Sequence, residues 1–143
     1  MKEIKRYKGC FVCGDLNPHG IKAVFWHDGS QAETTIVAGQ EFEGYRGIYH
    51  GGIMAALLDE VMIKAILALD IFAVTAEMTV RYKQPIMTGD RVVFRGRIVE
   101  HKGRVYVTEG EAVGDDGRIF AEATGKYLVA RPELREQLVR SLD

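Results

Sequence analysis

The segment that most constrains the fold is a long apolar stretch from Gly51 to about Leu69, followed by four segments of alternating pattern. Ala, Leu, Met and Ile dominate the stretch and no proline interrupts it, which predicts one long helix. The helix is apolar on nearly every side, so the rest of the chain must cover it. Links of hairpin length join the later segments and exclude parallel crossovers. The sequence therefore predicts an α+β fold in which a long antiparallel sheet curls around one buried helix.

The alternation is clearest between Phe72 and Lys83. Apolar residues occupy every second position there, and mostly polar residues lie between them. A period of two predicts a half-buried strand. Three further strands are predicted over 91–100, 104–113 and 118–129, separated by turns that contain glycine.

The two flanks are less regular. The first 21 residues are rich in turn formers, and residues 22–37 predict a short hairpin around Asp28-Gly29. The segment from Pro132 to about Leu142 predicts a short amphipathic helix with proline at its first position. A length of 143 residues fits one domain, which we expect over 1–143, with an N-terminal extension over 1–21 and a C-terminal helix over 131–143.

Charge and hydropathy limit the partners. Lys and Arg number 19 against 20 Asp and Glu, which gives a net charge of −1 and argues against recognition of nucleic acid or membranes by bulk charge. The charged N-terminus lacks the apolar core of a secretory signal, and no apolar run is long enough to span a bilayer. We therefore expect a cytoplasmic protein with no nucleic-acid or membrane partner.

The start of the long helix is a candidate binding site. His50, Gly51 and Gly52 stand where the first amide N–H groups have no partner within a helix and where the helix dipole is positive. Glycine lets another molecule approach the backbone closely, so this end suits a carbonyl oxygen that gains negative charge. The alternative is that the two glycines only permit tight packing of the helix start.

Two acids lie in the middle of the same helix. Glu60 has Lys64 four residues on, so we expect a structural ion pair. Asp59 has small residues on its face and no local partner, and a buried carboxylate is costly unless it is paired or reached by water or ligand. Asp59 is therefore the candidate functional acid, and the alternative is a core carboxylate hydrogen-bonded to a facing strand.

The spacing of these groups predicts an assembly. Gly51 and Asp59 are eight residues apart, so about 12 Å of helix separates them. A reacting carbon needs its base or nucleophile and its oxyanion donor within about 3–4 Å. One helix cannot supply both groups to one substrate, whereas two antiparallel copies can. If both groups act in catalysis, the protein is an obligate dimer.

These motifs resemble the acyl-CoA thioesterases of the hotdog fold, and most closely their phenylacetyl-CoA (PaaI-like) subfamily. The resemblance rests on His50-Gly51-Gly52 with Asp59 nine residues after the histidine, and on the strand AVTAEMTVRYKQP over 73–85. The opening motif CFVCG, over 10–14, is also similar to the start of many bacterial members. The likeness extends over about residues 10–130.

The resemblance implies hydrolysis of an acyl-CoA thioester to a free acid and CoA without a cofactor. Asp59 would be the base or nucleophile, and the Gly51 amide would polarise the thioester carbonyl across a dimer interface. His50 would position the substrate or its loop, and Thr75 would help to hold the water. Gly44 stands where some members carry an asparagine, six residues before the histidine. The implied assembly is a homodimer that pairs into a homotetramer.

Further residues are expected to contact the acyl-CoA. CoA carries phosphate groups, and Arg81 and Lys83 share one strand face, as do three arginines of the next strand. The alternative is a solvated face balanced by Glu109 and Glu111. The residues predicted to bind substrate are Gly52, Met54, Leu58, Met62, Arg81, Tyr82 and Lys83.

Cys10 and Cys13 are too few for a disulfide framework. A structural zinc needs four ligands, and only His19 and His27 are at hand to complete a set, at irregular spacing. We therefore expect no metal, and assign the cysteines to packing or to an occasional disulfide.

Two other functions compete with hydrolysis. A non-catalytic acyl-CoA-binding or regulatory protein could use the same fold, although a pure binder has little use for an acid in a buried helix. An acyl-CoA hydratase or dehydratase would carry an Asp and a His on one active-site loop, and no such pair is evident.

Overall fold

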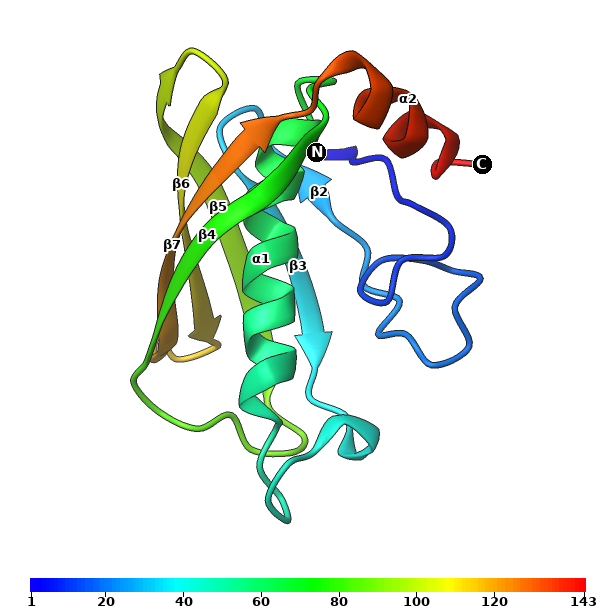
Figure 1. The fold of residues 1–143 in the computed structure, drawn as a ribbon. Coiled ribbons are helices and arrows are strands. Elements are labelled where there is room, and N and C mark those ends of the chain that lie inside the picture. Colours follow the sequence, from blue (N-terminus) through cyan, green and yellow to red (C-terminus); the bar gives the residue numbers. More distant parts are fainter.

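The computed structural model describes residues 1–143 and contains one sheet that wraps one side of a long helix (Figure 1). The sheet order is β1-β2-β3-β5-β6-β7-β4 and every pairing is antiparallel. The predicted antiparallel sheet around one long helix is therefore confirmed, but the four strands after the helix do not pair in chain order, because β4 pairs with β7 and not with β5. The elements are β1 (Lys2–Glu3), β2 (Trp26–His27), β3 (Ala32–Val37), η1 (Gln40–Phe42), α1 (Gly51–Leu67), β4 (Ala73–Tyr82), β5 (Arg91–Lys102), β6 (Val105–Gly114), β7 (Ile119–Val129) and α2 (Pro132–Arg140).

Helix α1 is covered on two sides. The sheet lies against one side, and the N-terminal segment and α2 lie on the other (Figure 1). The apolar core accordingly combines residues of α1 with sheet residues such as Phe94 and with Val12 and Phe25 from the N-terminal segment. This coverage explains most of the apolar surface of α1, whereas the face that carries Ala55, Ala56 and Asp59 is only half-buried. Neither helix is long and apolar enough to cross a bilayer.

Strand β4 forms one edge of the sheet and pairs only with β7. The alternation predicts that one face of this strand is buried. In the structure only Ala73 is buried, and the other residues are half-buried or exposed. An irregularity in the register between Thr75 and Glu77 places Ala76 outside the ladder. Such a bulge bends an edge strand and redirects its side chains.

The flanks differ from expectation in detail. The first hairpin is shorter than predicted on its first strand, which is only Trp26–His27, and it pairs with a further strand, Lys2–Glu3, that no pattern indicates. Two-residue strands carry too few alternating positions to produce a period. The short helix Gln40–Phe42 also lies between β3 and α1, where no periodic pattern predicts an element.

Helix α1 approaches β5 closely at one glycine. A Cβ atom placed on Gly96 would lie 2.5 Å from the backbone oxygen of Val61 in α1. Gly110, its neighbour across the β5–β6 ladder, would meet the Met62 side chain at 3.0 Å and the backbone oxygen of Arg95 at 3.3 Å. Backbone cannot yield without moving a whole element, whereas a methionine side chain adapts.

We expect Gly96→Ala to lower the free energy of unfolding by about 3 kcal/mol, the upper end of the usual cost of overpacking. Gly110→Ala is the matched control and should cost about 1 kcal/mol or less, because Met62 can take another rotamer. Urea unfolding followed by circular dichroism measures both. Equal losses in the two variants would contradict this account of the contact between α1 and β5.

Candidate functional site

The N-terminus of α1 has one backbone donor without a partner in the chain. The Gly52 N–H donates to Nδ1 of His50 at 2.8 Å, and the N–H groups of Ile53 and Met54 donate to the His50 carbonyl. The N–H of Gly51 makes no hydrogen bond within the chain. His50 thus caps the helix and leaves Gly51 as the amide that is free to bind a ligand oxygen.

A cavity of about 800 Å³ lies against this end of the helix. Tyr82 from β4 closes one side, and its hydroxyl donates to the Gly51 carbonyl oxygen at 2.7 Å. Gly44 packs against the imidazole of His50, where a Cβ atom would lie 3.2 Å from Cδ2. The lining residues are Glu43, Gly44, Tyr45, Ile48, Tyr49, His50, Gly51, Met54, Tyr82, Lys83, Gln84 and Pro85.

Asp59 has two partners that the local sequence does not indicate. Its Oδ1 accepts from the Thr75 hydroxyl at 2.8 Å and from the Tyr127 hydroxyl at 2.9 Å. Asp59 has no partner within its own segment, as expected, and the alternative of a carboxylate hydrogen-bonded to a facing strand is present, because strands β4 and β7 bring hydroxyl groups to α1. Asp59 is only half-buried, since it lies near the exposed edge strand β4. Its Oδ2 makes no hydrogen bond within the chain and is the oxygen left to act on a ligand.

Tyr127 is the member of this group that the sequence pattern does not single out. Its side chain is fully buried, and burial together with the adjacent Asp59 carboxylate raises the pKa of its hydroxyl. The hydroxyl therefore keeps its proton and acts as a donor. The only sequence signal is a tyrosine on the inward face of a strand, because a buried tyrosine hydroxyl normally requires a partner.

The predicted site residues fall into separate groups. His50, Gly51, Met54, Tyr82 and Lys83 line the cavity at the start of α1, whereas Asp59 and Thr75 meet about 12 Å further along the helix. Gly52 is exposed and is not among the residues that line the cavity, and its N–H is occupied by His50.

Three residues predicted to contact substrate lie elsewhere. Leu58 and Met62 are fully buried in the core, on the face of α1 that packs inward. Arg81 lines a polar depression on the sheet together with Arg95 and Arg97. These three residues do not line the cavity at Gly51, because residues that share a helix or strand need not share a pocket.

The basic residues of the sheet are largely paired. Arg97 bonds Glu109 at 2.6 Å, and Arg95 lies 3.7 Å from Glu111 and 3.5 Å from Glu33. Lys83 pairs with Glu122, which leaves Arg81 without an ion pair in the chain. Arg95 and Arg97 therefore form the balanced, solvated face that is the alternative to binding the CoA phosphates.

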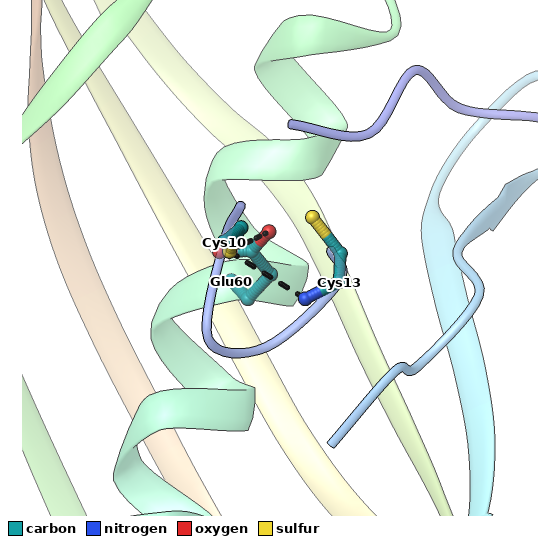
Figure 2. A group of neighbouring side chains, drawn as sticks. All are labelled: Cys10, Cys13 and Glu60. Atoms are coloured by element: carbon teal, nitrogen blue, oxygen red, sulfur yellow. Dashed lines mark hydrogen bonds between the residues drawn. The ribbon is translucent and has the colours of Figure 1, made fainter. Parts of the chain in front are cut away.

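A second cluster of reactive side chains lies beside α1. Glu60 pairs with Lys64 at 3.7 Å as expected, but the Cys10 thiol also donates to the same carboxylate at 3.7 Å (Figure 2). Burial raises the pKa of Glu60 to about 7. A bond from the Cys13 thiol lowers the pKa of Cys10 to about 5, and the same bond raises the pKa of Cys13.

The chain is similar over part of its length to two kinds of curated protein. The chain is 44% identical over 43 residues to the 3-hydroxyacyl-(acyl-carrier-protein) dehydratase FabZ of Campylobacter hominis. It is 30% identical over 95 residues to the acyl-coenzyme A thioesterase THEM4 of Xenopus laevis. The matches cover 30% and 66% of this chain, which spans only 29% and 43% of the length of these two relatives.

Solved structures share the fold. A thioesterase superfamily protein superposes with a TM-score of 0.79 at 24% identity, over 85% of this chain and 60% of that one. A hypothetical thioesterase from Streptococcus pneumoniae, solved with coenzyme A, gives 0.68 at 21% identity over 71% and 79% of the two chains. The Escherichia coli PaaI protein from the phenylacetic acid degradation operon gives 0.67 at 20% identity over 71% and 73%.

The arrangement of these relatives is the hotdog fold, in which a long antiparallel sheet packs against a central helix, as it does here on α1. A profile of the thioesterase superfamily matches residues 46–121, which include the capped start of α1, Asp59 and Thr75. The profile covers more than half of the chain, and the chain belongs to the thioesterase superfamily.

Proposed function

We propose that this protein hydrolyses an acyl-CoA thioester to a carboxylic acid and CoA. The observation that carries the proposal is the half-buried Asp59 carboxylate, oriented by two hydroxyl groups through Oδ1 and free at Oδ2. A carboxylate held in this way has one oxygen ready to accept a proton or to attack a carbonyl carbon. The free Gly51 N–H supplies the complementary donor for a carbonyl oxygen.

The reaction follows from these two groups. Asp59 Oδ2 takes a proton from water as the water oxygen attacks the thioester carbon, and the carbonyl oxygen becomes an oxyanion at the Gly51 N–H. When the intermediate collapses, the C–S bond breaks and the proton held by Asp59 passes to the departing CoA sulfur. Direct attack by Asp59 would instead form an anhydride that water then cleaves. After a single turnover in ¹⁸O-water, ¹⁸O in Asp59 would establish direct attack with water opening the anhydride at the Asp59 carbonyl carbon, whereas the general-base route places ¹⁸O only in the product acid.

The separation of the two groups requires a second subunit. Gly51 and Asp59 lie on one straight helix, about 12 Å apart along its axis. We propose a homodimer in which α1 of one subunit supplies Gly51 and α1 of its partner supplies Asp59. The exposed edge of β4, which carries Thr75, is the surface available for such pairing. Light scattering of the purified protein tests for the dimer and for a tetramer built from two dimers.

The comparisons support both the reaction and the substrate. THEM4 is an acyl-coenzyme A thioesterase, and the Streptococcus pneumoniae neighbour was solved with coenzyme A. A hypothetical thioesterase from the same strain was solved as two alanine variants, of an aspartate and of a threonine 16 positions later. Asp59 and Thr75 have the same separation. The likeness to PaaI favours an aryl-acetyl group among the substrates to be tried.

The direct test is release of free CoA from a panel of aryl and fatty acyl-CoAs of increasing chain length. We expect turnover with at least one member, reported by a thiol reagent in a continuous assay. Tight binding of acyl-CoA by calorimetry with no release from any member would instead establish the non-catalytic binder.

A second candidate is the dehydration of a 3-hydroxyacyl thioester. The likeness to FabZ favours it, as does the His50 imidazole at the cavity. The assay is hydration of an enoyl-CoA, followed by the loss of its ultraviolet absorption. Hydration faster than CoA release would make the protein a hydratase, whereas release without hydration supports the thioesterase.

Tyr127→Phe tests whether the Tyr127 hydroxyl orients the Asp59 carboxylate. Loss of the hydroxyl removes one of the two donors to Oδ1, so we expect kcat to fall about tenfold or more while KM changes little. Tyr106→Phe is the matched control, because Tyr106 pairs with Tyr127 across the sheet and its hydroxyl makes no hydrogen bond in the chain. Equal kcat values for the two variants would remove Tyr127 from the site.

A further inference from the structure

We propose that Cys10, Cys13 and Glu60 form a site for a soft divalent cation of the zinc class, separate from the Asp59 group. One ligand atom from each of the three residues lies within 4.8 Å of the other two. Two thiolates and a carboxylate are donors that zinc accepts. The sequence spacing alone leads to the opposite expectation, because Glu60 is far from the cysteines in the chain and reaches them only through the packing of the N-terminal segment on α1.

The loop that carries the cysteines already has the geometry of a metal-binding turn. The backbone N–H groups of Val12 and Cys13 point at the Cys10 sulfur, with N···S distances of 3.3 and 3.5 Å. The turn closes through the Gly14 N–H, which donates to the Cys10 carbonyl. N–H groups directed at a sulfur stabilise its thiolate form, which is the form that binds metal.

The loop is held against the helix that supplies the third ligand. Figure 2 shows the Cys10 sulfur beside the Glu60 carboxylate, with the loop passing along α1. The Lys64 ammonium donates to the Lys5 carbonyl and so ties the start of the chain to α1. Zinc–sulfur bonds of about 2.3 Å place tetrahedral ligand atoms about 3.8 Å apart, so a shift of about 1 Å closes the site.

The charges around the cluster favour a divalent ion. Metal binding deprotonates Cys13 and Glu60, whose pKa values are raised in the metal-free protein, so the ligand set then carries three negative charges, and the only cation facing it is Lys64, which is 1% exposed and lies 3.7 Å from the Glu60 oxygen. Three anions against one buried cation leave two negative charges in excess. A divalent cation neutralises this excess, and buried charges are stable only when they are paired.

The space beside the cluster leaves room for a fourth ligand. A cavity of about 520 Å³ adjoins the cluster and includes Tyr7, Cys10, Glu60 and Lys64 in its wall. Neither His19 nor His27 belongs to the cluster. Water or an exogenous ligand therefore completes the tetrahedron. The bound ion would cross-link the N-terminal segment to α1.

The test uses the full chain, reduced and freed of metal by a chelator. Titration with Co²⁺, which replaces zinc and reports thiolate ligands by its charge-transfer absorption, should give one ion per chain. We expect Cys13→Ser to abolish that absorption and Glu60→Gln to weaken binding at least about tenfold. His19→Ala is the control and should bind as the wild type does, and Mg²⁺ should not compete.

Several results would overturn the proposal. The first is a wild-type protein that binds Co²⁺ no better than Cys13→Ser does, although titration shows both of its thiols to be reduced. Such a protein has no metal site. Unchanged affinity in Glu60→Gln, or a loss in His19→Ala, would assign the ligands elsewhere. A Cys10–Cys13 disulfide that still forms with zinc present would make the pair a redox device instead. Should Cys13→Ser fail to fold by circular dichroism, Cys10→Ser at the half-buried cysteine takes its place.

Discussion

Replacing Asp59 by asparagine should lower kcat for acyl-CoA hydrolysis by about 10³-fold or more. Asparagine keeps the shape of the side chain, and its single carbonyl oxygen can still accept from the hydroxyl groups of Thr75 and Tyr127. The group that then stands in place of Oδ2 is an NH₂, which can neither accept a proton from water nor attack a carbonyl carbon. The folded structure is therefore preserved while the chemistry is lost.

The measurements are the rate of CoA release and the binding of substrate by calorimetry. Binding should persist in Asp59→Asn, because Asp59 acts on the reacting carbon rather than on the CoA. Asp70→Asn is the matched control, since Asp70 is exposed just beyond the end of α1 and pairs with Lys5. Turnover of Asp59→Asn at the wild-type rate would eliminate Asp59 as base or nucleophile.

Gly51→Pro should lower kcat by about 10²–10³-fold, the cost of removing one oxyanion donor. Proline lacks the N–H that is otherwise free at this position, and it is well tolerated at the first residue of a helix. The preceding residue, His50, already has the extended backbone that a following proline demands, at φ −62° and ψ 130°. The substitution thus deletes a donor at little cost in stability.

Gly51→Ala is the companion variant that keeps the N–H. Its added Cβ would lie 3.5 Å from the Tyr82 ring, an ordinary van der Waals contact, so it should lose far less activity than Gly51→Pro. Similar losses in the two variants would show that bulk at residue 51, and not the amide, is what matters.

The two inactive variants together test the shared site. If each site takes Gly51 from one subunit and Asp59 from the other, a mixed dimer of Gly51→Pro and Asp59→Asn has one intact site and one doubly defective site. Random assortment after co-refolding should then restore about a quarter of the wild-type activity. No recovery from a preparation that contains mixed dimers would place both groups in one subunit.

Much of the fold follows from patterns within single elements. The apolar run that begins at Gly51 and the alternation from residue 72 onward predict α1 and the four long strands, with ends that agree within two or three residues. These patterns are local, because periods of 3.6 and 2 report which face of an element is apolar. The separation of Gly51 and Asp59 follows in the same way from the rise of a helix.

Local sequence patterns predict only part of the candidate site. The family resemblance predicts Thr75 but not Tyr127, since a strand pattern does not reveal which inward side chain meets which helix residue. Met62 shares the helix with Met54, yet Met54 reaches the cavity and Met62 lies in the core. Arg81 and Tyr82 are adjacent in β4 and point to different sites, because successive strand residues face opposite sides.

The sequence by itself determined that one apolar helix must be wrapped by an antiparallel sheet, and that an acid and a helix N-terminus on that helix cannot serve one substrate. Only the tertiary structure decided that Tyr127 and Thr75 orient Asp59, and that Glu60 meets Cys10 beside Lys64. The physical reason is the distance along the chain over which each effect acts. Backbone periodicity acts over one or two turns, whereas the pairing of polar side chains depends on the register and packing of elements far apart in the chain.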